Sequence, residues 1–425
     1  MGRLIYTALF LMLYPLILLR LWHRSRKAPA YAQRWRERLG YYPQELATVP
    51  HQSIWVHAVS VGETIAALPL IRALQERHPA IPVIVTTMTP TGSERVQAAL
   101  GSSVIHVYAP YDSPGAIKRF LRQFRPRLLV IMETELWPNT IHYARLSGAK
   151  VALVNARLSE RSARGYGKVS WLSRPLMRNL DIILSQGQSD ADRFKSLGVP
   201  AANITVTGSI KFDLAVSDEC LQQGAALREK LGQQRPVWIA ASTHDGEDEA
   251  LLRVHRSLQE TLPDLCLILV PRHPERFNDV VQLAARAGYR FGRKSCPETI
   301  SADIDVLVGD TMGEMMGMYA ASDVAFVGGS LVQHGGHNPL EPAALGLPIV
   351  MGEHVFNFAD ICARLEQVQG LTRVRDEHAL QSVLQLWFQN RDVSVATGAN
   401  AQRFQRDSRG SLKQVLDQLD SFLQQ

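Results

Sequence analysis

Four glutamates share a local pattern that predicts positions near helix N-termini. Each lies three residues after a potential capping residue, at or near the end of a predicted strand: Ser60 and Glu63, Thr91 and Glu94, Thr311 and Glu314, and Asn338 and Glu341. In a capping box such a glutamate only accepts a hydrogen bond from the N-cap amide. Helix N-termini beyond parallel strands also bind anions and sugars, because unpaired amides and the helix dipole point there. The pattern therefore locates a candidate cleft without choosing between these roles.

A second acidic pair, Glu133 and Glu135, follows an apolar predicted strand. Alternation along a strand would put both side chains on one side of the sheet. There each carboxylate can raise the pKa of the other, and general acid–base chemistry requires a carboxyl group with a raised pKa. An acid pair that is solvated at the strand end, or that caps the next helix, fits the same pattern. Three basic residues also follow predicted strands and could meet a ligand phosphate or carboxylate: Arg157, Lys211 and Arg272.

The segment VGGSLVQHGGHNPLEPAALGLPIVMG, residues 327–352, combines glycines with two histidines ahead of a predicted helix. Its glycines allow positive φ and a close backbone approach, as a nucleotide phosphate would need: Gly328, Gly329, Gly335 and Gly336. The sequence has no G-x-x-x-x-G-K-[ST] motif and no strand-linked G-x-G-x-x-G motif. Binding of ATP by a P-loop and binding of a dinucleotide are therefore not favoured.

The acids and cysteines do not indicate a metal site. The D-x-D patterns at residues 190–192 and 303–305 lie at a predicted helix start and a predicted strand start, so we expect capping or solvated acids. The four cysteines have no C-x-x-C spacing, which argues against a zinc site or a disulfide framework and fits a reducing compartment. We expect neither a metal nor a cofactor.

These residues must be positioned by a repeating α/β chain. The 425 residues, 46% of them hydrophobic, can bury a large core. Short apolar runs alternate with amphipathic stretches and predict strands at 53–59, 82–88, 103–109, 127–133, 151–156, 181–185 and 204–208, then at 236–242, 265–271, 305–310, 324–329 and 348–352. The polar stretch 213–235 predicts a linker with one helix. The pattern favours two doubly wound domains with a ligand cleft where the strand ends converge.

The N-terminus predicts a membrane anchor. Residues 1–40 carry eight Arg and Lys against Glu37 alone, so the +6 of the whole chain leaves −1 for the other 385 residues. A basic segment beside the apolar run 4–19 indicates an anionic membrane surface, and no nucleic-acid partner is expected. The run is slightly short of the ~20 residues that span a bilayer. A cleaved signal peptide is disfavoured, because the A-x-A pattern at 28–30 lies beyond the basic cluster. The positive-inside rule places the body on the cytoplasmic side.

Eight motifs, in order, carry a family resemblance: AVSVGET (58–64), TTMTPTGSERV (86–96), IMETELWPN (131–139), NARLSERS (155–162), TGSIKFD (207–213), LVPRHPERF (269–277), VGDTMGEM (308–315) and FVGGSLVQHGGHNPLEPAA (326–344). The chain closely resembles the 3-deoxy-D-manno-octulosonic acid (Kdo) transferases of lipopolysaccharide synthesis. The resemblance covers nearly the whole chain, including the N-terminal anchor.

The resemblance implies a GT-B, inverting glycosyltransferase that moves Kdo from CMP-Kdo to the lipid A precursor, lipid IVA, without a metal. It would act at the bacterial inner membrane, held by a single-pass or monotopic anchor and by anionic lipid. Carried over by motif, Glu63 would be the general base, and Glu133 and Lys211 would stabilise the transition state. CMP would be held by Pro271, Arg272, Met312, Gly313, Glu314, Asn338, Pro339, Leu340 and Glu341.

The implied domains are an anchor with its basic segment (1–40), an acceptor-binding Rossmann-like domain (41–212), a linker (213–235) and a CMP-sugar-binding Rossmann-like domain (236–425). Two alternatives stay open. Another GT-B nucleotide-sugar enzyme, such as a UDP-sugar transferase or epimerase, would share the fold. A non-catalytic nucleotide-sugar-binding membrane protein would keep the C-terminal motifs and lose the base, so the presence of Glu63 favours an enzyme.

Overall fold

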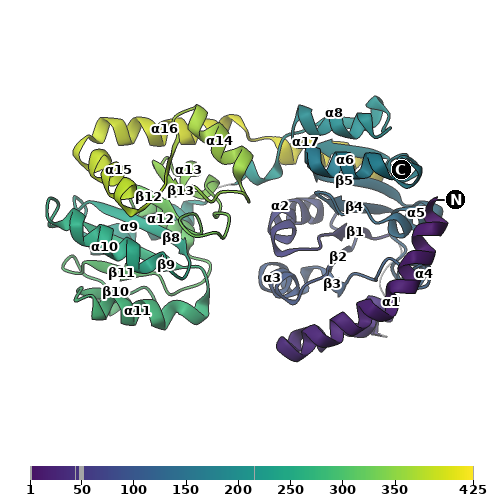
Figure 1. Cartoon of the computed structure of the whole chain (residues 1–425), viewed down its shortest axis with the longest axis horizontal. Helices are drawn as coiled ribbons and strands as arrows, with labels where there is room; N and C mark the ends of the chain where they lie inside the picture. The colour runs from purple at the N-terminus through teal and green to yellow at the C-terminus, as the bar shows by residue number, and fades with distance from the viewer. Residues whose placement is uncertain (1, 44, 47–51, 215, 425) are drawn as a thin grey trace. The chain divides into compact units, whose positions relative to one another are not determined.

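The computed structural model describes residues 2–43, 45–46, 52–214 and 216–424. The chain forms two compact units, residues 1–213 with 410–425, and residues 214–409. Each unit contains one seven-stranded sheet with helices on both faces (Figure 1). All twelve predicted strands are present, and the predicted α/β class with two doubly wound sheets is confirmed.

The sheet of the first unit is parallel throughout, in the order β3-β2-β1-β4-β5-β6-β7. Nearly every strand residue is buried, as expected when helices cover both faces. The chain adds strands toward one edge from β1 and toward the other from β4, so the order reverses between these two neighbours. The strands are β1 (Ile54–His57), β2 (Val83–Thr87), β3 (Ile105–Tyr108), β4 (Leu128–Met132), β5 (Lys150–Ala156), β6 (Ile182–Ser185) and β7 (Ile204–Val206).

Two hydrophobic cores lie on the two faces of this sheet. One face is covered by α2 (Val61–Arg77), α3 (Pro90–Leu100) and α17 (Ser411–Leu423). The other face is covered by α4 (Pro114–Phe124), α5 (Pro138–Leu146), α7 (Ser170–Met177) and α8 (Gln188–Ser196), and α6 (Glu160–Lys168) precedes α7.

The sheet of the second unit is also parallel, in the order β10-β11-β9-β8-β12-β13-β14, and reverses between β8 and β12. The sequence did not predict its two edge strands, β10 and β14, because both are short and only partly buried. The strands are β8 (Val237–Thr243), β9 (Cys266–Pro271), β10 (Phe291–Arg293), β11 (Val306–Val308), β12 (Val324–Val327), β13 (Ile349–Gly352) and β14 (Leu371–Val374).

The helices of the second unit are α9 (Asp218–Leu231), α10 (Asp248–Gln259), α11 (Phe277–Arg286), α12 (Met315–Ala320), α13 (Leu340–Ala344), α14 (Ala359–Gln367), α15 (Glu377–Gln389) and α16 (Arg391–Asp407).

The units differ from the predicted domains in two segments. The predicted linker 213–235 contains α9, which packs tightly on α12: a Cβ added to Gly224 would lie 2.4 Å from the Cβ of Ala320. Residues 410–425, predicted to end the second domain, belong to the first unit. There the yellow helix α17 of Figure 1 packs on α2 and β5 through buried Leu416 and Leu419. Each of these two helices belongs to the unit against which its apolar face packs. The local polarity of the sequence does not show which unit that is.

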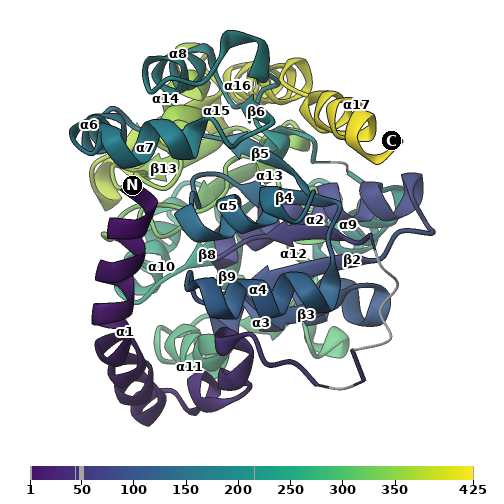
Figure 2. The same ribbon diagram turned by 90° about the vertical axis from the view of Figure 1, so that its right-hand side faces the viewer.

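Helix α1 (Gly2–Lys27) is a single helix whose residues 2–26 are long and apolar enough to cross a membrane. It extends past the predicted run 4–19 on the basic side. Its first turns contact α5 and α7 (Figure 2), and the Oδ1 atom of Asn139 accepts hydrogen bonds from Arg3 Nη1 (2.9 Å) and Thr7 Oγ1 (3.0 Å). The beginning of α1 is therefore attached to the first unit by polar contacts.

We predict that Leu419→Ala loosens the first unit alone. Leu419 is fully buried, and a buried Leu→Ala change costs about 2–5 kcal/mol. Hydrogen exchange of the whole chain should become faster for amides of α2 and β5 and stay unchanged in residues 214–409. Leu221→Ala, on an exposed face of α9, is the matched control. Faster exchange in the second unit would instead support the predicted boundary at 236–425.

Candidate active site

The reversal point of the first sheet gathers the three residues predicted to be catalytic. Glu63 lies in the first turn of α2, directly after β1 and its short connection, and Glu133 is the first residue after β4. Lys211 lies in the 3₁₀ helix η6 (Ile210–Phe212), which follows β7. Ligands of open α/β sheets bind outside the carboxyl ends of the strands at such a reversal point.

Glu63 is held by capping contacts. The Oγ atom of Ser60 accepts a hydrogen bond from the Glu63 amide at 3.3 Å, which confirms Ser60 as the N-cap of α2. The carboxylate accepts hydrogen bonds from the Val59 amide (Oε2, 2.7 Å) and from Ser60 Oγ (Oε1, 2.9 Å). These donors hold the side chain in one orientation, so Glu63 does act as a capping glutamate.

Glu63 is also poised to exchange a proton. The residue is only 9% exposed. Its pKa is raised to about 7, first by burial and then by the charges of Glu135 and Glu133, while the hydrogen bonds from Val59 and Ser60 oppose the shift. A carboxyl group with a pKa near 7 can accept a proton at neutral pH and be regenerated, which is the property of a general base.

Glu133 and Lys211 form a half-buried ion pair, with 2.9 Å between Lys211 Nζ and Glu133 Oε1. Glu133 has a left-handed backbone with φ 55°, and its amide still donates to the Val154 carbonyl oxygen at 2.9 Å. The predicted reason for pairing Glu133 with Glu135 is wrong, because β4 ends at Met132 and both glutamates lie beyond it, in the segment that turns toward α5. The pKa of Glu135 is nevertheless raised, mainly by burial and also by the charge of Glu133.

Asn155 positions the segment that carries Lys211, and the sequence analysis assigned it no role. Its Oδ1 atom accepts hydrogen bonds from Ser209 Oγ (3.1 Å) and from the Ile210 amide (3.2 Å). Asn155 is fully buried, has φ 53° and lies at a β-bulge in β5. An asparagine in a predicted strand, directly before the alanine that ends it, was the available signal, since asparagine tolerates this conformation better than most residues.

The other three predicted capping pairs, which begin at Thr91, Thr311 and Asn338, differ from the prediction in their N-cap residue. Thr91 does not cap α3: the N-cap is Thr89, and Glu94 is exposed. Glu314 itself occupies the N-cap position of α12 without a side-chain capping bond, and its Oε1 atom accepts a hydrogen bond from Lys294 Nζ at 3.0 Å. The N-cap of α13 is Pro339 and not Asn338, although the Oδ1 atom of Asn338 accepts a hydrogen bond from the Leu340 amide at 3.1 Å.

The nine residues predicted to bind CMP all lie in the second unit, at the carboxyl ends of three strands. Pro271 ends β9 and Arg272 follows it; Met312, Gly313 and Glu314 follow β11; and Asn338, Pro339, Leu340 and Glu341 follow β12. Met312 is exposed, Gly313 has φ 87° with open space around it, and Asn338 Nδ2 donates to Glu341 Oε1 at 3.4 Å. The three loops present amides, a guanidinium group and carboxylates at one edge of the sheet.

Glu247, which the sequence analysis did not single out, organises the glycine loop. Its buried carboxylate accepts hydrogen bonds from the amides of Gly329 (Oε2, 2.7 Å), Ser330 (Oε1, 3.1 Å) and Leu331 (Oε1, 3.0 Å), and from the His244 amide (Oε2, 2.9 Å). These bonds join the segment after β8 to the segment after β12. Four backbone amides bond to this carboxylate, so we assign Glu247 a structural role.

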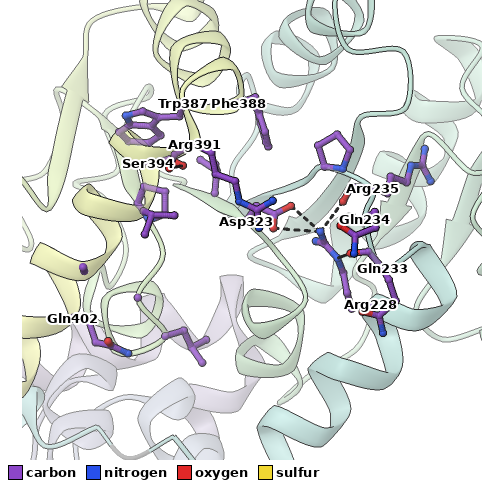
Figure 3. Close-up of a pocket in the computed structure, with 17 residues that line it drawn as sticks. Arg228, Gln233, Gln234, Arg235, Asp323, Trp387, Phe388, Arg391, Ser394 and Gln402 are labelled. Atoms are coloured by element: carbon purple, nitrogen blue, oxygen red, sulfur yellow. Dashed lines mark hydrogen bonds and ion pairs between the residues drawn. The ribbon is translucent and has the colours of Figure 1, made fainter.

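A pocket of about 420 Å³ lies at the opposite, amino-terminal edge of the same sheet (Figure 3). Three of its lining residues pair with one another: Arg228 Nη2 contacts Asp323 Oδ2 at 3.0 Å and donates to the Arg235 carbonyl oxygen at 2.6 Å. These groups are satisfied within the fold, so the strand-end loops remain the candidate site.

Comparisons with known proteins agree with the residue pattern. The family model described as 3-Deoxy-D-manno-octulosonic-acid transferase (kdotransferase) matches residues 33–214. The 3-deoxy-D-manno-octulosonic acid transferase of Haemophilus influenzae is 44% identical over 425 residues, covering 100% of this chain and 99% of its own. The chain belongs to the Kdo transferase family. The enzyme of the same name from Bordetella pertussis is 37% identical over 434 residues, covering 100% of both chains.

Solved structures establish the fold. A putative UDP-N-acetylglucosamine 2-epimerase from Listeria monocytogenes aligns with a TM-score of 0.55 at 13% identity, covering 88% of this chain and 97% of its own. A glycosyltransferase from Rickettsia africae aligns with a TM-score of 0.54 at 12% identity, covering 88% and 99%. This Kdo transferase family member is thus a glycosyltransferase with the predicted GT-B fold.

We predict that Glu63 titrates near pH 7. Its pKa rises from 4.5 to about 7 on folding, so between these values the folded state binds more protons than the unfolded state. The chain should therefore lose stability as pH rises through this window, by on the order of 3 kcal/mol. Infrared difference spectra between pH 6 and pH 8 should show loss of a protonated carboxyl band that is absent in Glu63→Gln. A band unchanged by the substitution would assign this titration to another acid.

Proposed function

We propose that this protein transfers Kdo from CMP-Kdo to the lipid A precursor, lipid IVA, in lipopolysaccharide synthesis, with inversion at the anomeric carbon. The observation that carries the proposal is the buried Glu63, with a pKa raised to about 7, beside the Glu133–Lys211 ion pair. Family membership supports the reaction class, and the site supports the role of each residue.

In the proposed mechanism the first unit binds the acceptor, and Glu63 removes the proton from its attacking hydroxyl group. The hydroxyl oxygen forms a bond to the anomeric carbon of Kdo while the bond from that carbon to the CMP phosphate oxygen breaks. The electron pair of the broken bond leaves with CMP, and the proton stays on Glu63. Attack opposite to the leaving group inverts the configuration.

Lys211 supplies positive charge where negative charge develops in the transition state. Glu133 holds the ammonium group at 2.9 Å, and Asn155 fixes the backbone that carries it. Preorganisation matters here because donors that are already in place need not reorganise during the reaction.

The second unit binds the donor through the nine residues of its three strand-end loops. The guanidinium group of Arg272 can pair with the phosphate. Glu341 accepts hydrogen bonds from ribose hydroxyls beside Asn338, whose side chain bonds the Leu340 amide. We place the protein at the cytoplasmic face of the bacterial inner membrane, held by α1 and by anionic lipid at the basic segment 20–38.

We predict that Glu63→Gln abolishes transfer and leaves CMP affinity unchanged, because Glu63 lies in the first unit and the CMP residues lie in the second. Glutamine can keep the capping contacts but cannot take the proton. In the wild type, turnover should rise as pH passes through about 7. Glu94→Gln, an exposed glutamate on α3, is the matched control. Near-normal transfer by Glu63→Gln would leave Glu63 with the capping role only.

We predict that Glu341→Ala weakens CMP binding by about 1–3 kcal/mol, the cost of leaving buried hydroxyl groups unpaired. Calorimetry with CMP alone measures this effect without the acceptor. UDP, titrated in parallel, should bind far more weakly than CMP if the enzyme uses a CMP-sugar. Glu229→Ala, exposed on α9, should not change either affinity. Unchanged CMP affinity in Glu341→Ala would remove Glu341 from the proposed site.

A further inference from the structure

Four histidines meet at the reversal point of the second sheet. The imidazole of His244, after β8, stacks on His334 (centroids 4.1 Å apart, planes at 13°) and lies parallel to His337 (5.1 Å, 2°); both of these residues follow β12. His273, after β9, meets His244 edge-on at 5.4 Å. The Nε2 atoms of His244 and His337 are 2.8 Å apart, so one imidazole donates a hydrogen bond to the other.

The backbone makes room for these rings. Gly329 has φ 69°, and a Cβ added there would lie 3.1 Å from His337 Cδ2 and 3.3 Å from His244 Cδ2. Glu247 holds the segments that carry the two rings, through its bonds to the amides of Gly329 and His244. The imidazole pair is therefore a packed feature of the fold and not a chance meeting of surface side chains.

The charges that face the cluster are positive. The pKa of His244 is lowered to about 4, first by burial and then by the neighbouring His334, His273, Arg272 and Arg276. Burial likewise lowers the pKa of His337 to about 3, with Arg272 as the next cause. At neutral pH the two imidazoles are therefore uncharged.

The nearby acids are bonded to other groups, and Asp248 offsets the charge of Arg276. Both Glu247 oxygens accept backbone amide bonds, Asp248 is paired with Arg276, and Asp245 is an almost fully exposed side chain 3.9 Å from Arg276. The described residues contain no cluster of three or more His, Cys, Asp or Glu arranged to hold a metal ion. An anion is thus the ligand that this arrangement accommodates.

We infer that His244, His273, His334 and His337 form a proton-linked anion site for the donor, one that takes up a proton when a phosphate or carboxylate oxygen binds. The inference rests on the proposed function, because Arg272 and Asn338, assigned to CMP, adjoin His273 and His337 in the chain. CMP-Kdo carries two anionic groups, the phosphate and the carboxylate of the sugar acid. An anion within hydrogen-bond reach favours the imidazolium form, whose N–H groups all donate.

Anion binding and proton uptake by the histidines should favour each other. Anion binding raises the pKa of the imidazole pair, so affinity rises as pH falls, by about tenfold per pH unit for each proton taken up. Departing CMP carries more negative charge on its phosphate than the bound donor does. The charged cluster therefore also stabilises the leaving group.

The test is calorimetry of the full chain in detergent with a chelator, at pH 7, in two buffers of different ionisation enthalpy. The ligand is the 5′-phosphate methyl ester of CMP, which has no ionisation near neutral pH, so any proton uptake belongs to the protein. Cytidine is the uncharged control, and free Kdo added to the CMP-saturated enzyme tests the carboxylate separately. We expect uptake of about one proton with the methyl ester or with Kdo, and none with cytidine.

His244→Gln combined with His337→Gln should remove the uptake and weaken methyl-ester binding at pH 6 by about 10- to 100-fold, the effect of losing hydrogen bonds to a charged group. His334→Gln, at an exposed position, should reduce the uptake; His378→Gln, exposed on α15, should not. Ligand binding without proton uptake in the wild type would overturn the inference and leave the proposed function intact. Failure of CMP itself to bind would overturn both.

Discussion

Both sheets reverse the direction in which strands are added, and this topological constraint decides where chemistry can occur. In the first unit β1 and β4 are neighbours although the chain leaves them toward opposite edges, and β8 and β12 repeat this in the second. The connections after two such strands diverge, so the carboxyl ends remain open to a ligand. Glu63 and Glu133 follow the first pair of strands, and His244 and His337 follow the second pair. The reversal of strand order therefore places one polar cluster in each sheet, the glutamates in the first and the histidines in the second.

Glu63 shows how a capping residue can also be a reactive one. A glutamate in the first turn satisfies donors at the helix start, and two hydrogen bonds hold its carboxylate in place. Burial beside Glu135 and Glu133 then disfavours the charged form by on the order of 3 kcal/mol, judged from the shift of its pKa from 4.5 to about 7. The hydrogen-bond donors fix the orientation of the carboxyl group, and burial, together with the acidic neighbours, raises its proton affinity.

Unusual backbone conformations gather at the same strand ends. Glu133, Asn155 and Ser242 all have φ between 53° and 59°, directly after β4 or at bulges in β5 and β8. Residues other than glycine in this region cost about 1–3 kcal/mol each and persist where the surrounding structure compensates. Here the compensation is visible, because Glu133 gains its bond to Lys211, and the Asn155 side chain holds the backbone of η6. The distortions turn side chains out of the sheet and toward the site.

The sequence by itself determined the α/β class, twelve of the fourteen described strands, the two sheets, the family, and the residues that follow each strand. It could do so because hydrophobic periodicity and motif order are local properties of the chain. It did not determine the edge strands β10 and β14, which are too short and too exposed to leave an apolar run. The sequence also did not show that α17 belongs to the first unit and α9 to the second. The pattern of an amphipathic helix shows that one face is apolar, but not which sheet that face will cover. Only the tertiary structure decided that Lys211 pairs with Glu133 and that His244 meets His337. These partners lie 78 and 93 positions apart, and the order of strands in each sheet, a result of packing the whole unit, brings them together.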